Sequence, residues 1–150
     1  MIQRIQTIYI LLAAVLGGVG LFLNWVSYEL VDQVFNLIPI GEGDDGVHSS
    51  FLVFPLAMLL GVHIAAIFQF KNRKQQMQSV RIAMVVALLT LVGFSFEHYR
   101  NINAFAAQAD VQMHYGMATI FPIVVLVLDW MALKAIKKDE DLVRSVDRLR

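Results

Sequence analysis

Residues Phe51 to Phe70 read FLVFPLAMLLGVHIAAIFQF, and His63 is the only ionisable residue among them. A helix that crosses a membrane needs about 20 mostly apolar residues. Further apolar stretches cover about residues 5–26, 80–97 and 115–133. They are continuous apolar runs without alternation, which predicts helices rather than strands. The sequence therefore predicts an all-α fold, a four-helix transmembrane bundle that forms a single integral membrane domain over residues 1–150.

The composition also indicates a membrane protein. Hydrophobic residues make up 58% of the 150 residues and charged residues 16%, whereas soluble chains have about 45–50% and about 25%. The formal net charge is zero, which argues against a nucleic-acid partner. The chain has no cysteine, which excludes disulfides, iron–sulfur clusters and thiol nucleophiles. A cleaved signal peptide is the alternative for the first run, but its length favours a retained anchor.

The basic residues predict the orientation. If all four runs span, the N-terminus, the loop 71–79 and the tail 134–150 share one side, which carries 11 of the 12 lysines and arginines. The positive-inside rule makes this side cytoplasmic, so both termini are expected in the cytoplasm of a bacterium, with the chain in its inner membrane. The loop 27–50 faces outward and contains no basic residue. Its apolar first part, Tyr28 to Ile40, either lies on the membrane or forms a short strand pair.

The tail is expected to be a cytoplasmic amphipathic helix. Its acidic residues come before most of its arginines, as the helix dipole favours. Leu142, Val146 and Leu149 fall on one face. This face either docks on a partner or on the membrane surface, or packs under the chain's own bundle. Basic residues on the same side are candidate contacts for a partner or an anionic lipid, although the positive-inside rule alone explains them. They are Lys71, Arg73, Lys74, Lys137 and Lys138.

Three segments on this side carry a family resemblance. They are MIQRIQT at residues 1–7, KNRKQQM at 71–77, and AIKKDE followed by LVRS and DRLR in the tail 135–150. In this order they resemble a family of short four-span inner-membrane proteins from Bacteroidetes, known only as a domain of unknown function. The resemblance covers the whole chain and implies four transmembrane helices in a bacterial inner membrane. It implies no catalytic or ligand-binding residue.

Small residues and prolines predict how the helices pack. Ala57, Gly61 and Ala65 recur every four residues, with similar pairs at 13/17, 14/18 and 83/87. Helices in lipid associate by close backbone approach, so we expect these faces to join the chain's own helices; contact with another subunit is the alternative. Pro55 is expected in the first turn of its helix. Pro122 is expected inside the fourth helix, where it would kink it.

Two ionisable residues lie at membrane depth. His63 and Asp129 fall towards the cytoplasmic ends of the second and fourth runs, so the two side chains could meet. A histidine–aspartate pair of this kind can relay protons. The structural interpretation is that Asp129 pairs with Arg81 or Lys134 and that a neutral His63 donates to a backbone carbonyl.

A second group of polar residues lies at the outer edge. Glu97, His98, Asp110 and His114 could hold a metal, but no HExxH motif supports this. His98 and His114 lie at matching depth and are weak candidates for the axial ligands of a haem. Interfacial capping also explains them, and we expect no cofactor.

We therefore expect a non-enzymatic accessory or structural subunit of a larger membrane assembly, with the lipid bilayer and a protein in the inner membrane as partners. No catalytic residue is expected, because no G-x-S-x-G motif or phosphate-binding loop occurs. The alternative is a redox or proton-linked membrane protein that uses the histidines and Asp129.

Overall fold

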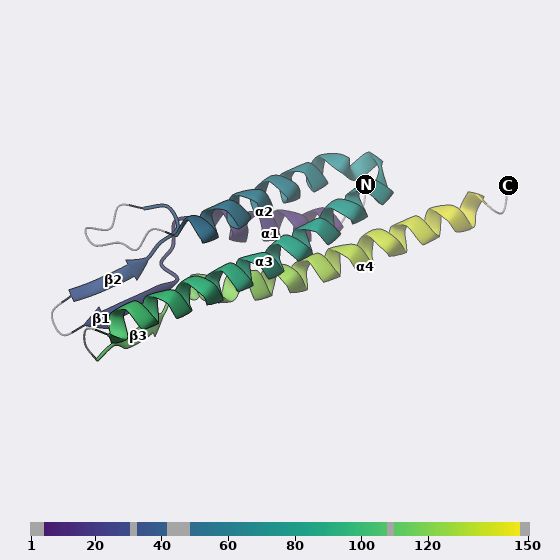
Figure 1. Cartoon of the computed structure of the whole chain (residues 1–150). Coiled ribbons are helices and arrows are strands. Elements are labelled where there is room, and N and C mark those ends of the chain that lie inside the picture. Colours follow the sequence, from purple (N-terminus) through teal and green to yellow (C-terminus); the bar gives the residue numbers. More distant parts are fainter. Residues whose placement is uncertain (1–4, 31–32, 42–48, 108–109, 148–150) are drawn as a thin grey trace.

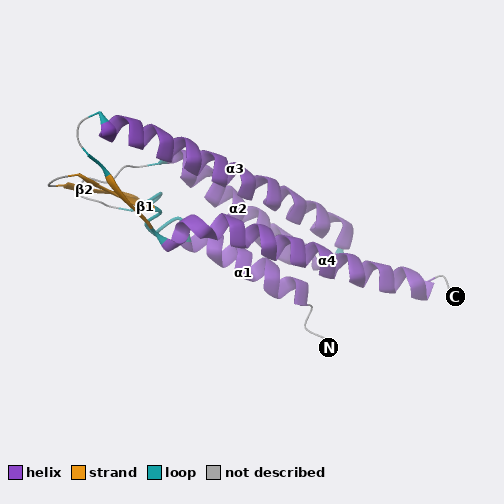
Figure 2. Cartoon of the chain, turned by 90° about the horizontal axis from the view of Figure 1, so that it is seen from below, coloured by secondary structure: helices purple, strands orange, loops and turns teal. Residues whose placement is uncertain are grey.

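The structure is a computed structural model, and it describes residues 5–30, 33–41, 49–107 and 110–147. Four helices form the bundle: α1 (Ile5–Val19), α2 (Ser50–Phe68), α3 (Arg73–Ala106) and α4 (Phe121–Asp147). They pack as a ring in which α1 and α3 each lie between α2 and α4. A small sheet lies at one end of the bundle, here called the sheet end, and α4 projects past the other helices at the opposite end, here called the tail end (Figures 1 and 2).

The outer surface of the bundle is apolar, whereas its interior contains small and polar residues. Phe54 is 76% exposed and Val92 65%, while Ala13, Ala83 and His63 are fully buried. Large apolar side chains such as Leu56 also lie inside, but so many on the outside is unlike the arrangement expected in water, where they are most often buried. Three helices are long and apolar enough to cross a membrane, namely those covering Phe51–Lys71, Arg73–Ala106 and Met117–Val143.

The first helix is shorter than expected. We predicted a run to residue 26, but α1 ends at Val19 and has 15 residues, which corresponds to about 22 Å. The chain then turns, with Leu21 N–H donating to the Gly18 carbonyl and Phe22 N–H to that of Val19. Glycines in this stretch favour such turns. Val26 already belongs to a strand. The length of the apolar run therefore overestimated the length of the first helix.

The third and fourth helices are longer than predicted. Asn72 caps α3, its side chain accepting from Gln75 N–H at 3.2 Å, so α3 begins well before residue 80. The fourth run and the tail form one helix, because α4 continues without a break to Asp147. Residues 134–138 contain no glycine or proline to end it, and buried Ile136 keeps this part packed on the bundle. The tail is therefore not a separate helix.

The fold is not all-α, because three strands form an antiparallel sheet in the order β2-β1-β3. They are β1 (Val26–Leu30), β2 (Gln33–Leu37) and β3 (Gln112–Tyr115). The alternation in β1 explains the sheet: Val26 and Tyr28 are buried and Glu29 is exposed, as expected for a strand with one face on a core. Of the two possibilities for residues 28–40, the structure has the strand pair. Residue 115, the expected start of the fourth span, belongs to β3.

Gly116 brings the sheet close to the bundle. Its N–H donates to the Trp25 carbonyl at 2.8 Å, and the Thr119 hydroxyl donates to the same carbonyl at 2.6 Å. A Cβ at residue 116 would overlap the carbonyl oxygen of Asn24. Trp25 is fully buried, with its ring centroid 5.4 Å from that of Phe94. The β3–α4 connection therefore requires glycine at this position.

Both prolines lie elsewhere than predicted. Pro55 is in the second turn of α2 rather than the first. It lacks the N–H that would donate to the Phe51 carbonyl, and Gly93 of α3 lies against this oxygen, since a Cβ at residue 93 would be only 3.0 Å from it. Pro122 is in the first turn of α4 and not in its interior, so the expected kink is absent there. Phe121 N–H donates to the Ala118 carbonyl instead.

The small residues differ in the direction they face. Ala13, Gly17, Ala83 and Ala87 are buried between the chain's own helices, as expected. The repeat Ala57, Gly61 and Ala65 is exposed, and a Cβ at Gly61 would meet nothing within 4 Å. The expectation that this repeat packs the chain's own helices is therefore wrong. The buried face of α2 carries Leu52, Leu56, Leu59, His63 and Ala66 instead.

Candidate functional site

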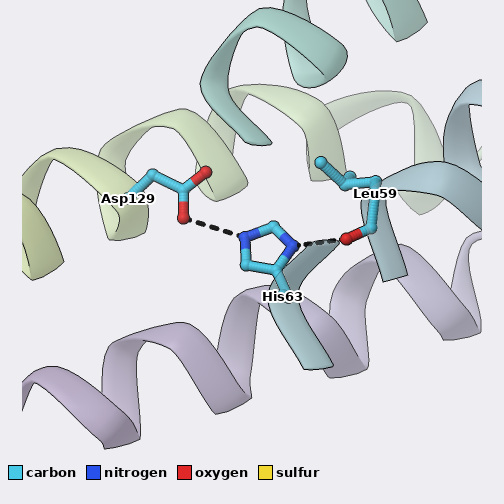
Figure 3. A network of polar contacts seen from close by, with 3 residues as sticks. All are labelled: Leu59, His63 and Asp129. Carbon is cyan, nitrogen blue, oxygen red and sulfur yellow. Dashed lines mark hydrogen bonds and ion pairs between the residues drawn. The ribbon is translucent and has the colours of Figure 1, made fainter. Parts of the chain in front are cut away.

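The bundle centre contains a hydrogen-bonded histidine and aspartate. His63 Nε2 lies 2.9 Å from Asp129 Oδ1, and His63 Nδ1 lies 2.7 Å from the Leu59 carbonyl oxygen. Both side chains are fully buried. Figure 3 shows the imidazole between its two partners, with Asp129 reaching it from α4. Because α2 and α4 are not neighbours in the ring, this contact joins the helices across the bundle axis.

The geometry determines how many protons the pair holds. A carbonyl oxygen can only accept, so His63 Nδ1 carries a hydrogen and donates to Leu59. The Nε2–Oδ1 contact needs one further proton, which belongs either to the imidazole or to the carboxyl group. In both arrangements the pair as a whole is neutral. A neutral pair suits an apolar interior, where an isolated charge is very costly.

The turns on either side of the pair are apolar. Leu59 and Val125 lie one turn towards the sheet end, and Ala66 and Ala132 lie about one turn towards the tail end; all four are buried. Asp129 Oδ2 has no hydrogen-bond partner among the described residues. Among the described residues, the carboxyl group therefore has one oxygen without a partner inside an apolar shell.

The structure does not bring His98 and His114 together. His98 Nδ1 lies 2.8 Å from Tyr28 Oη, and His98 Nε2 lies 3.0 Å from Tyr115 Oη. His114 directly precedes Tyr115 on β3, so by alternation it points to the opposite face of the strand. There its Nε2 lies 3.3 Å from the Glu29 carboxylate, and both side chains are exposed. The two histidines are thus not arranged as axial ligands of one haem, and the described residues contain no group of three or more metal-ligating side chains.

Tyr28 is a residue that sequence analysis missed. It is fully buried under the sheet, and this burial raises its pKa to about 12. The neutral phenol lies 2.8 Å from His98 Nδ1, so the imidazole is held between the hydroxyl groups of Tyr28 and Tyr115. Phe94 stacks on the imidazole with a centroid distance of 5.6 Å. The alternating pattern of β1 was the available signal, because it places Tyr28 on the same face as Val26.

A second buried polar contact was also missed. Gln6 Nε2 of α1 lies 3.5 Å from Gln76 Oε1 of α3, and Gln76 Nε2 donates to the Ala66 carbonyl of α2 at 3.1 Å. Both glutamines are buried near the tail end. Arg73 Nη1 nearby donates to the Asp139 carbonyl of α4 at 2.9 Å. These contacts tie the four helices together at the end where the basic residues gather.

The other predicted contact residues lie at or beyond this end. Lys71 and Lys74 are exposed beside Arg73, and the Lys71 ammonium lies 5.9 Å from the Phe70 ring centroid. Leu142 is 57% exposed on the projecting part of α4. Leu149 and the side chain of Val146 lie outside the described residues.

An apolar outer surface around a buried, neutral histidine–aspartate pair defines a class of small helical-bundle proteins with helices able to cross a membrane. The family described as Domain of unknown function (DUF4293) matches residues 2–149, and the chain belongs to this family. The resemblance to a family of unknown function, predicted from the three basic-side segments, is thus confirmed. No curated protein and no solved structure matches the chain.

Proposed function

We propose that this chain is a multi-pass protein of the bacterial inner membrane and a non-enzymatic accessory subunit of a larger membrane assembly. The apolar outer surface and the three long apolar helices support insertion in a bilayer. Helix α1 begins and α4 ends at the same end of the bundle (Figure 2). The lysines and arginines 71–74 and 134–138 gather there, which favours a cytoplasmic location for both termini.

The observation that carries the accessory role is the projecting part of α4. Ile136 is fully buried, but Asp141, Leu142 and Val143 are exposed, so the helix leaves the bundle after about residue 140. Figure 1 shows this segment extending past the other helices. An exposed leucine and valine on a helix that extends past the other described helices suit a partner that covers the apolar face. Of the two interpretations of the tail, this geometry favours docking over packing under the chain's own bundle.

The test is capture of a partner from the native membrane. The tagged full chain is extracted gently from its host, and the proteins that co-purify are identified by mass spectrometry. We expect a stoichiometric partner that is lost in the variant Leu142→Ser/Val143→Ser and kept in the control Ser145→Ala, an exposed residue on the same segment. A chain that purifies alone, or a partner kept equally by both variants, would refute docking through this segment.

The buried pair favours a second candidate, a proton-linked membrane protein. A neutral pair that already shares one proton, with one free carboxyl oxygen, can bind a further proton. The redox form of this alternative loses its support, because His98 of α3 contacts Tyr115 on one face of β3, whereas His114 points away from the opposite face. The test is proton flux in vesicles that contain the purified chain, measured with an entrapped pH dye. Flux that disappears in His63→Leu/Asp129→Ala would favour the proton-linked role, and vesicles as tight as protein-free ones would exclude it.

A further inference from the structure

The exposed side of α4 changes from apolar to basic within about one helical turn. Towards the sheet end it presents Ile123, Val127 and Trp130, all about half exposed. Beyond Trp130 it presents Lys134, Lys137 and Lys138, which are also exposed. Tryptophan is enriched at the boundary between hydrocarbon and water, and the headgroup layer beyond this boundary is about 5–8 Å thick. The lysines follow Trp130 by four to eight residues, or about 6–12 Å along the helix.

The three lysines share one face of the helix. Their spacing of three and four residues makes their ammonium groups neighbours, and like charges at this spacing repel each other. Together with Asp141, Leu142 and Ser145 they line an open groove of about 470 Å³. Among the lining residues that the structure describes, three are lysines and one, Asp141, is acidic, which gives an excess of two positive charges. The Lys134 ammonium lies 3.5 Å from the Trp130 ring centroid, which holds it at the level of the boundary.

We propose that this groove binds the phosphate headgroup of an anionic phospholipid of the cytoplasmic leaflet. The inference rests on the proposed membrane location but not on the proposed accessory role. The charge of the groove is complementary to a phosphodiester, and its position beside Trp130 is where lipid phosphates lie. The groove is separate from Lys71 and Lys74, which lie on the chain before and at the start of α3. Leu142 is itself part of the groove lining, whereas Val143, the other residue of the docking proposal, is not.

The test measures which lipids stay bound to the full chain. The purified chain is inserted into vesicles with equal amounts of phosphatidylglycerol and phosphatidylcholine, and native mass spectrometry counts the lipids that remain on it. We expect retained phosphatidylglycerol on the unchanged chain and loss of it in Lys134→Gln/Lys137→Gln/Lys138→Gln. The affinity of the groove should fall about a hundredfold, because each lysine near an anionic surface contributes about fivefold.

A matched control removes three positive charges elsewhere at the tail end. The variant Lys71→Gln/Lys74→Gln/Arg81→Gln changes exposed residues outside the groove and should keep the bound phosphatidylglycerol. Equal loss in both variants would mean general attraction to an anionic surface, and would overturn the site. Displacement of the lipid by glycerol phosphate at similar concentration would assign the groove to a soluble phosphate instead. A chain that inserts without preferring phosphatidylglycerol refutes the site alone, whereas a chain that does not insert refutes the membrane location.

Discussion

The stability of the bundle should depend on His63 and Asp129 as a unit rather than as separate residues. The perturbation is a double-mutant cycle of His63→Leu, Asp129→Ala and the two together, with Asp129→Asn as a conservative fourth variant. Leucine and alanine together have close to the combined volume of the native pair, so the double variant leaves little cavity. Both side chains are fully buried and contact each other at 2.9 Å, which makes each one the other's charge partner.

The expected loss of unfolding free energy depends on which buried groups each variant leaves without a partner. His63→Leu leaves a buried carboxyl group without its histidine, which should cost about 3–5 kcal/mol of unfolding free energy. Asp129→Ala leaves His63 Nε2 without a partner and a small cavity, which should cost about 1–3 kcal/mol. The double variant should be about as stable as the unchanged chain, because apolar replacement of a buried pair is often neutral or better.

Asp129→Asn tests the tautomer directly. Since the Leu59 carbonyl holds the hydrogen on His63 Nδ1, Nε2 of a neutral histidine can accept from the new amide. We therefore expect a loss of no more than about 1 kcal/mol.

The assay is reversible unfolding of the purified chain in mixed micelles, followed by circular dichroism as denaturing detergent increases. The reasoning is wrong if the double variant loses as much stability as the two single variants combined, since the two residues would then contribute independently. A double variant that keeps its stability but no longer conducts protons would assign the pair to function instead of structure.

Two further predictions concern the sheet end. Gly116→Ala should lower the unfolding free energy by about 1–3 kcal/mol, because its Cβ would overlap the Asn24 carbonyl oxygen. Gly61→Ala is the control, since its Cβ has open space, and equal stability of both variants in the same assay would contradict the close approach. Burial raises the pKa of Tyr28 from 10.0 to about 12, so the unfolded chain loses this proton first as the pH rises. The contribution of Tyr28 to the unfolding free energy should be constant below about pH 10. It should then fall by about 3 kcal/mol as the pH rises to about 12. Tyr28→Phe should remove this part of the pH dependence, and an unchanged decline between pH 10 and 12 would show that Tyr28 is not its source.

The buried faces of the helices follow a spacing that can be read in the sequence. Apart from Val86, the buried residues of α3 are 76, 80, 83, 87, 90, 94, 97 and 101, with alternating steps of four and three. Residues 52, 56, 59, 63 and 66 of α2 follow the same rule. This heptad spacing is typical of helices packed side by side. Applied to the sequence, it predicts that Gln76, Glu97 and Asn101 point into the bundle, and it excludes Ala57, Gly61 and Ala65 from the interior.

The small-residue rule led to the wrong face of α2 for a physical reason. Alanine and glycine permit close approach but do not require it, and in lipid an apolar outer face costs nothing. On α2 the leucines pack the interior, together with His63, while the small residues face outward. Polar residues are a better guide, because a histidine or glutamine facing lipid would lose its hydrogen bonds.

The sequence by itself determined the apolar runs, the end at which the basic residues gather, the family, and the positions of His63 and Asp129 within their apolar runs. These follow from local composition and from the length of chain that a bilayer requires. Only the tertiary structure decided that α1 ends at Val19, that β3 joins the strand pair, and that His63 meets Asp129 across 66 positions of sequence. Such contacts depend on the rotation and axial position of each helix relative to the others. Those are set by the packing of all four helices and the sheet together, and no single segment encodes them.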